Sequence, residues 1–161
     1  DTIQIVMNSE LYRVSSKEHV YNRFITITFT ENRIHIVNRH ECLVDDSVIS
    51  SAPTGGLIAV QHTILTAISM PNYFTDTPPC EPVNNRSTDN ISGTLYWTGG
   101  SIEVRNIFGK GKDTYEGNLC VYTKEVPMRS KIYLYTIKPT KAGTPIKKGE
   151  TILGEFEYLF R

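Results

Sequence analysis

The sequence lacks an excess of charge of either sign. Its 161 residues include 17 Lys and Arg and 17 Asp and Glu, so the formal net charge at pH 7 is zero. Phosphate binding draws much of its affinity from excess Lys and Arg, and this chain gives no electrostatic reason to expect nucleic acid or an anionic membrane as a partner. Long hydrophobic runs are also missing, because polar residues interrupt each apolar stretch before the roughly 20 residues that a membrane span requires.

Signatures of catalysis are missing as well. The run Phe108–Asp113 contains glycines, but it has neither the Walker spacing nor a following helix, so we interpret it as a flexible turn. The pair Asp45 and Asp46 lacks the alternating oxygen ligands and the glycine of an EF-hand calcium loop. We therefore expect no enzymatic activity and no cofactor.

The histidines do not form a known metal motif. His35 and His40 are five positions apart, on an expected strand and at its exit, which is not the i, i+4 arrangement of a helical metalloprotease. We expect solvated or core histidines and no bound metal. The alternative is that these two join His19 or His62 at a metal.

Cysteine is scarce. Cys42, Cys80 and Cys120 are spaced too widely for a zinc knuckle or a CxxC redox pair. One disulfide plus one free thiol is the simplest arrangement for a secreted protein, and three pairings are possible. We favour Cys80 with Cys120, because both lie beside Gly, Pro or Asn in expected surface connections. Three buried thiols in a cytosolic protein are the alternative.

What the sequence does contain is a succession of β-rich runs. Residues 23–29 alternate strictly, with Ile25, Ile27 and Phe29 on one face. Residues 94–98 and 101–105 flank Gly99-Gly100, which predicts a hairpin. Further strands are expected at residues 2–7, 33–37, 131–137 and 151–160. Short strands at this spacing predict an all-β sandwich or barrel in a single domain over residues 1–161.

Three segments carry more specific expectations. Gly55–Met70 fits either a short helix or two strands. Pro71–Asp89 is proline-rich and irregular, which predicts a long surface loop of the kind that carries binding residues. In the final run we expect a half-buried strand, with Ile152, Phe156, Tyr158 and Phe160 on one face and Glu155 and Glu157 on the other.

The remaining polar and aromatic residues suit a sugar ligand. Carbohydrate hydroxyls both donate and accept hydrogen bonds, so their sites favour Asp, Asn and an aromatic face. Turn formation is an equally good role for the Asp and Asn residues, and the lone Trp97 is assigned to the core. The candidates for ligand binding are Asp45, Asp46, Tyr73, Asp76, Asn84, Asn85, Arg86, Asp89 and Asn90.

One family resemblance emerges in the C-terminal third. The run Val126–Ile152, with Ile132-Tyr133-Leu134-Tyr135-Thr136 followed by Ala142-Gly143 and Ile146-Lys147-Lys148-Gly149, resembles the closing strands of the lectin domains of chaperone-usher pilus tip adhesins. The strand Thr94–Trp97 is similar to one of their strands, and Cys42 followed by Asp45-Asp46 is similar to one of their loops. The resemblance covers about 40 residues.

The resemblance implies a receptor-binding domain. It implies an immunoglobulin-like or jelly-roll β-sandwich, exported through the periplasm to the fimbrium tip, where it binds a host glycan or glycoprotein. The chain, which starts at Asp1 and ends at Arg161, would be a monomeric domain cut from a two-domain adhesin. The missing pilin domain would engage the periplasmic chaperone, the usher and the adjacent pilin. The alternatives are a structural pilin completed by a neighbour's strand, and a metal-dependent adhesin using histidines.

Overall fold

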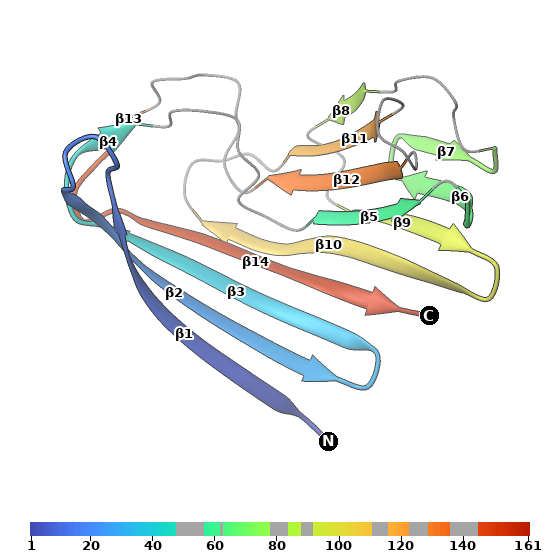
Figure 1. Cartoon of the computed structure of the whole chain (residues 1–161), viewed down its shortest axis with the longest axis horizontal. Helices are drawn as coiled ribbons and strands as arrows, with labels where there is room; N and C mark the ends of the chain where they lie inside the picture. The colour runs from blue at the N-terminus through green and yellow to red at the C-terminus, as the bar shows by residue number, and fades with distance from the viewer. Residues whose placement is uncertain are drawn as a thin grey trace.

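A large antiparallel sheet forms the body of the protein (Figure 1). The computed structural model describes residues 1–47, 57–61, 63–77, 84–87, 92–110, 116–122, 129–135 and 145–161. The sheet has 8 strands in the order β1-β2-β3-β14-β10-β9-β6-β7. These are β1 (Ile3–Tyr12), β2 (His19–Thr30), β3 (Arg33–Cys42), β14 (Thr151–Phe160), β10 (Gly100–Lys110), β9 (Ser92–Trp97), β6 (Leu65–Met70) and β7 (Tyr73–Thr75).

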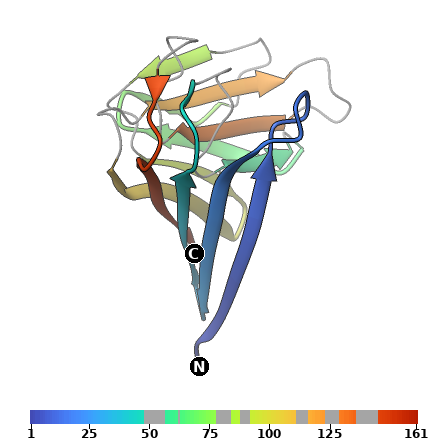
Figure 2. The same cartoon turned by 90° about the vertical axis from the view of Figure 1, so that its left-hand side faces the viewer.

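A smaller sheet packs on one half of the large sheet. It has 4 strands in the order β5-β12-β11-β8, and a separate pair joins β13 to β4 near the far end of β2 and β3. Figure 2 shows the long strands β1, β2 and β3 extending away from the smaller sheet. The strands are β5 (Leu57–Gln61), β12 (Arg129–Tyr135), β11 (Glu116–Tyr122), β8 (Asn84–Ser87), β13 (Pro145–Ile146) and β4 (Asp46–Ser47).

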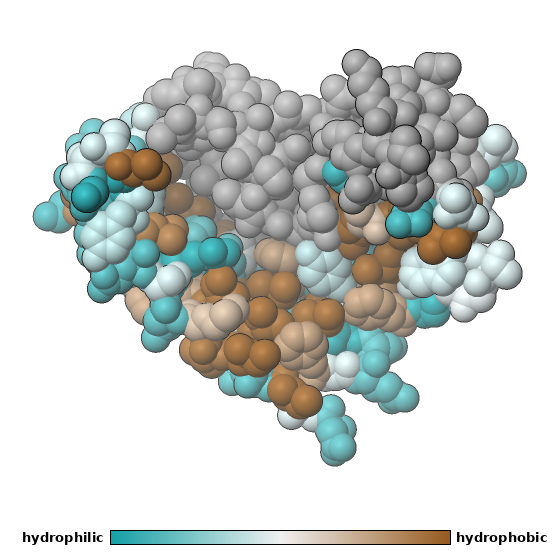
Figure 3. All heavy atoms as spheres, in the orientation of Figure 1, coloured by the Kyte–Doolittle hydropathy of each residue, from teal (hydrophilic) through white to brown (hydrophobic). Residues whose placement is uncertain are grey.

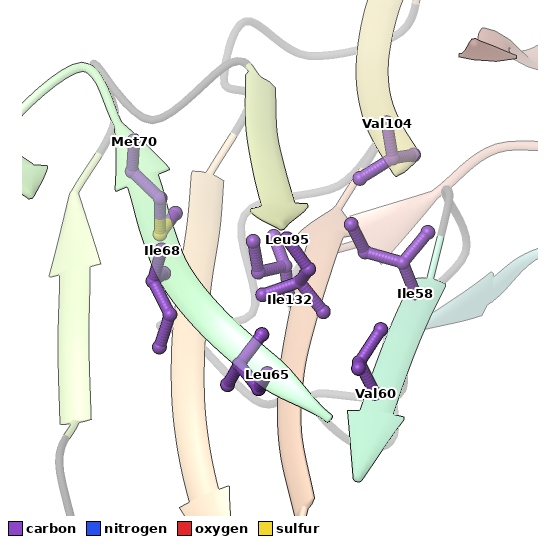
Figure 4. Packing of buried hydrophobic residues seen from close by; sticks show 8 residues of the cluster. All are labelled: Ile58, Val60, Leu65, Ile68, Met70, Leu95, Val104 and Ile132. Carbon is purple, nitrogen blue, oxygen red and sulfur yellow. The ribbon is translucent and has the colours of Figure 1, made fainter. Parts of the chain in front are cut away.

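The hydrophobic core lies between the two sheets (Figure 4). Ile132 of β12 is fully buried and faces Leu95, Ile68 and Val104 of the large sheet, which are fully buried as well. Burial of such side chains contributes roughly 1.5 to 3 kcal/mol each. The packing of two sheets around one core makes this an all-β sandwich, as predicted. The core consists of Ile58, Val60, Leu65, Ile68, Met70, Leu95, Val104 and Ile132.

The smaller sheet covers only part of the apolar face. Paired residues of antiparallel strands share a face, so the row Val104, Tyr158, Ile34, Phe29 and Ile3 crosses β10, β14, β3, β2 and β1 on the core side. Exposure along this row rises from 0% at Val104 to 64% at Ile3. Hydrophobic side chains accordingly gather over β1, β2, β3 and β14 on the surface in Figure 3. We call this surface the open half of the apolar face.

Several expected strands are confirmed. The alternation at residues 23–29 lies within β2, and residues 2–7 enter β1, which pairs with β2 along its length. The predicted hairpin joins β9 and β10, although the turn is formed by Thr98 and Gly99 and not by the two glycines. Gly99 has φ +88°, and Gly100 already pairs with Trp97. Trp97 packs against the core, as assigned.

Gly55–Met70, which fitted a helix or two strands, contributes the strands β5 and β6. Ile58 and Val60 of β5, and Ile68 and Met70 of β6, are buried two positions apart, which is the period of a strand. Leu65 is also buried but departs from this alternation, because the pairing of β6 with β9 shifts register between Leu65 and Ala67. Within the described ranges there is no helix with the length and apolar character needed to cross a bilayer.

Three local predictions are wrong. The segment Pro71–Asp89 is not one loop, because β7 and β8 lie within it. Phe108–Lys110 of the expected glycine turn belong to β10, and its remaining residues, 111–113, lie outside the described residues. In β14 the two faces are not simply apolar and polar, because Glu157 is 6% exposed while Phe160 is 40% exposed. Glu157 is buried because Arg33 and Arg105 pair with its carboxylate, at 3.5 and 2.5 Å.

Candidate functional site

A cavity opens where β1 turns into β2. Its volume is about 550 Å³, within the range of small-molecule sites. The turn is closed by backbone hydrogen bonds, from Arg13 N to Glu18 O at 2.8 Å and from Lys17 N to Arg13 O at 2.7 Å. Lys17 adopts φ 56°, which reverses the chain there. The lining residues are Leu11, Tyr12, Arg13, Val14, Ser15, Val20, Tyr21 and Asp46.

Asp46 is the fixed acidic group of this cavity. Tyr21 donates its hydroxyl hydrogen to Oδ2 at 3.0 Å, and Arg13 donates from Nη2 to Oδ1 at 3.2 Å. Arg13 also pairs with Glu18 Oε2 at 2.8 Å. Each carboxylate oxygen can accept a further hydrogen bond. The carboxylate is therefore held in one orientation and still has capacity for a hydroxyl donor.

Two tyrosines line the cavity, Tyr12 and Tyr21. Tyr12 stacks on His19 with ring centroids 5.0 Å apart, and Glu10 accepts a hydrogen bond from its hydroxyl at 2.5 Å. That bond to Glu10 raises the pKa of Tyr12. Burial, and then the bond to Asp46, raises the pKa of Tyr21 strongly, so its hydroxyl keeps its proton. Val14 stands at the rim, 96% exposed.

Polar residues continue from the cavity along the open half of the apolar face. Arg23 follows Tyr21 on the same face of β2, and it pairs with His40 of β3. The Tyr21 and His40 rings meet edge to face at 6.2 Å. Burial, and then the charge of Arg23, lowers the pKa of His40 to about 4, so this histidine is neutral at pH 7.

Cys42 lies opposite Tyr21 and is a free, buried thiol. It donates to Val44 O at 2.8 Å, and burial raises its pKa. Of the predicted pair, Cys120 belongs to β11, of which the structure describes the backbone, and Cys80 lies outside the described residues. The pairing of Cys80 with Cys120 stays a prediction.

The predicted binding residues do not come together. Asp46 lines the cavity, whereas Asp45 points to the β13 turn, where Lys147 Nζ and the Lys148 amide bond to it at 3.2 and 2.9 Å. These bonds, the Lys148 amide first, lower the pKa of Asp45. Tyr73 and Asp76 lie at β7, the opposite edge of the large sheet (Figure 1).

At that opposite edge, the environment is less suited to a ligand. Tyr73 packs against the hydrophobic core, and Asp76 is exposed and accepts a bond from the Thr77 hydroxyl at 3.4 Å. Asn84, Asn85 and Arg86 belong to β8, and their side chains lie outside what the structure describes. Asp89 and Asn90 lie outside the described residues altogether.

The histidines have separate environments. Both His35 and His40 lie within β3, on opposite faces, and His35 pairs with Glu155 at 2.8 Å. His19 stacks on Tyr12, and its Nε2 lies 3.2 Å from Tyr21 O. In the part of the chain that the structure describes, no group of at least three His, Cys, Asp or Glu side chains could hold a metal ion. His62 falls outside that part.

Sequence reasoning missed Tyr12, Arg13 and Tyr21. One signal was present: Tyr21 and Arg23 occupy the same face as Ile25, Ile27 and Phe29, so two polar residues open an otherwise apolar alternation. Polar residues on a core-side face need partners or a ligand. The contact of Arg13 with Asp46 was not predictable, because it joins residues 33 positions apart.

Comparisons with known proteins give a likeness of fold. Neither a protein-family model nor a curated protein matches this sequence. The whole chain superposes on 65% of a candidate aldose 1-epimerase from Escherichia coli K12, with a TM-score of 0.53 and 10% identity. It also superposes on 28% of the galactosidase domain of the alpha-galactosidase-sucrose kinase AgaSK, with a TM-score of 0.50 and 12% identity. The chain thus spans less than two thirds of each, and at these identities the likeness is limited to the β-sandwich.

Proposed function

We propose that this domain binds a carbohydrate in the cavity between the β1–β2 turn and β4. The observation that carries the proposal is the fixed carboxylate of Asp46, bonded to the Tyr21 hydroxyl and to Arg13, in a cavity that Tyr12 and Tyr21 line. Sugars combine an apolar C–H patch with hydroxyls that donate and accept, and this cavity offers one surface for each. The names of the two similar structures, which refer to sugar substrates, agree with this ligand class.

The biological setting that we propose comes from the C-terminal resemblance. The domain would be the receptor-binding part of a fimbrial tip adhesin, with an immunoglobulin-like or jelly-roll sandwich, and would attach bacteria to a host glycan at the cell surface. It would be a monomer that works without enzymatic activity, cofactor or metal. Chaperone, usher and neighbouring pilin would bind a pilin domain that follows it. Cooperative unfolding of the purified chain without a donor peptide would support this setting, and polymerisation relieved by such a peptide would favour a structural pilin.

A second candidate function is interconversion of sugar anomers. The fold likeness to a candidate aldose 1-epimerase favours it, together with the neutral His40 next to Tyr21, because anomer exchange needs a proton acceptor and a donor. Polarimetry of freshly dissolved galactose, with and without the protein, tests this function. Catalytic acceleration that His40→Gln removes would establish it in place of a binding domain.

The experiment for the binding site uses two aspartates, Asp46 in the cavity and Asp76 beside β7 at the far edge of the large sheet. A glycan array, followed by calorimetry on the best ligand, compares wild type with Asp46→Asn, Tyr21→Phe and Asp76→Asn. We expect Asp46→Asn to weaken binding roughly tenfold or more, because a charged hydrogen bond is lost, and Asp76→Asn to bind like wild type. Loss of binding in Asp76→Asn with full binding in Asp46→Asn would place the site at β7 and refute the cavity.

A further inference from the structure

Arg23 differs from the other arginines whose side chains the structure describes. No Asp or Glu within that part of the chain pairs with its guanidinium, and its recorded hydrogen bond goes to an amide oxygen. The others each form an ion pair with a carboxylate; they are Arg13, Arg33, Arg39, Arg105 and Arg161. An unneutralised cation on a partly apolar surface is costly unless something compensates for it.

The surroundings of Arg23 hold its side chain in place. Its Nε donates to Asn38 Oδ1 at 3.2 Å, and Asn38 is itself buried. Because Nε is used in this way, the two terminal amino groups remain as a pair of donors. This end of a guanidinium matches the two oxygens of a carboxylate. Arg23 thus has a fixed orientation, and among the residues that the structure describes nothing binds its pair of terminal amino groups.

Of the residues described next to Arg23, none supplies a counter-charge. Its strand partners are Ser9 of β1 and His40 of β3, and neither is acidic. The charge of Arg23 is felt at His40, whose pKa is lowered first by burial and then by this arginine. Asp46, which belongs to the cavity, is already engaged by Arg13 and Tyr21.

Arg23 is within reach of a ligand in the cavity. It lies two residues after Tyr21 on the same face of β2, and alternate residues of a strand are about 7 Å apart. A sugar ring with its substituents bridges such a distance. A ring packed on Tyr21 with a substituent directed along β2 would therefore bring that substituent to the Arg23 guanidinium, which lies beyond the residues that line the cavity.

We propose that the sugar bound by this domain carries a carboxylate, as uronic and sialic acids do, and that the terminal amino groups of Arg23 bind that carboxylate. The proposal rests on the carbohydrate function proposed above and narrows it to acidic sugars. Arg23 sets the specificity, whereas Tyr21 and Asp46 hold the ring and its hydroxyls.

The test compares sugars that differ by one group. Calorimetry or ligand-detected NMR at fixed ionic strength measures galacturonate against galactose, glucuronate against glucose, and sialyllactose against lactose. We expect wild type to bind at least one acidic member roughly tenfold to a hundredfold more tightly than its neutral partner. Arg23→Gln should lose that preference and bind the neutral sugar as before. Arg23→Lys should keep part of it, because the charge remains without the bidentate geometry.

The matched control is Arg39→Gln. Arg39 lies on the opposite face of β3, where it pairs with Glu41 and covers the Phe24 ring, so this change removes the same charge from the other side of the sheet. It should leave the preference intact. Thermal unfolding of each variant confirms that the fold is retained.

The outcomes separate this inference from the proposed function. Equal affinity for acidic and neutral sugars, unchanged by Arg23→Gln, would overturn the role of Arg23 and leave the sugar site standing. A stronger preference for galactose 6-sulfate than for galacturonate would overturn the choice of a carboxylate. Absence of binding to every sugar would overturn both proposals.

Discussion

Acid should destabilise this protein through His40. The ring is half-buried beside Arg23, and burial together with that charge lowers its pKa from 6.5 to about 4. The folded state therefore favours neutral histidine, whereas the unfolded chain binds a proton at the ordinary pKa. The contribution of His40 to stability is complete above about pH 6.5 and is lost as the pH falls towards 4.

The size of the effect follows from the shift. A change in the pKa of His40 from 6.5 to about 4 corresponds to about 3 kcal/mol in the free energy of unfolding, if the whole shift acts on folding. Because the ring is only half-buried, solvent screens part of this interaction, and we expect about half of it, roughly 1.5 kcal/mol. That is a large fraction of the stability of a typical domain.

Urea unfolding at pH 7.5, 5.5 and 4.0 measures the effect. Other titrating groups destabilise wild type and His40→Gln equally as the pH falls, so the difference between their free energies of unfolding isolates the His40 ring. Between pH 7.5 and 4.0 wild type should lose about 1.5 kcal/mol more than His40→Gln. NMR titration of the ring gives the pKa directly, and Arg23→Gln should raise it. Titration of His40 near 6.5, with parallel stability curves for both proteins, would refute the reasoning.

Three further predictions concern packing and reactivity. A Cβ at Gly93 would lie 2.7 Å from Ile132 Cδ1, so Gly93→Ala should lower the free energy of unfolding by about 2 kcal/mol. The double variant with Ile132→Val should lose less than the sum of the two single losses, and strict additivity would show that β9 and β12 do not meet. The amide nitrogen and oxygen of the Asn106 side chain are buried with no hydrogen-bond partner in the part of the chain that the structure describes. Asn106→Leu should therefore raise the free energy of unfolding by about 1 kcal/mol, whereas a lower urea midpoint for this variant would mean that the amide is hydrogen-bonded. Cys42 is 2% exposed with a raised pKa, so a thiol reagent should modify it slowly in the folded protein and rapidly in urea, and equal rates would contradict its burial.

The strands of this fold were predictable where alternation is strong. The period of two at residues 23–29 predicted β2, and the pattern at residues 94–105 predicted the hairpin. The prediction failed at Pro71–Asp89, because short edge strands such as β7 have too few residues to show a period. It failed at Glu157 because a buried carboxylate depends on Arg33 and Arg105, which reach it from two other strands.

The candidate site was predictable only at Asp46. Its partner Tyr21 belongs to the strand whose apolar alternation had been recognised, but alternation alone does not say what faces a polar residue on the core side. That depends on where the smaller sheet ends, because β10 lies under it while β2 belongs to the open half of the apolar face. The extent of that sheet is set by contacts between distant strands, which one sequence does not reveal.

The zero net charge of the chain gives no guide to the charge preference of its ligand. Screening limits the interaction of exposed charges to about 10 Å, so a ligand in the cavity is affected mainly by the groups around it and little by the total. There, Arg13 is neutralised by Glu18 and Asp46, while Arg23 faces an amide and a neutral histidine. Counted over the described residues, the local charge at Arg23 is therefore positive in a chain that is neutral as a whole. The sheet partly shields the proposed contact between Arg23 and the sugar carboxylate from solvent. The preference for acidic sugars should therefore weaken only modestly between 50 and 300 mM salt. A preference that disappears over that range would show that exposed surface charge, and not Arg23, selects the ligand.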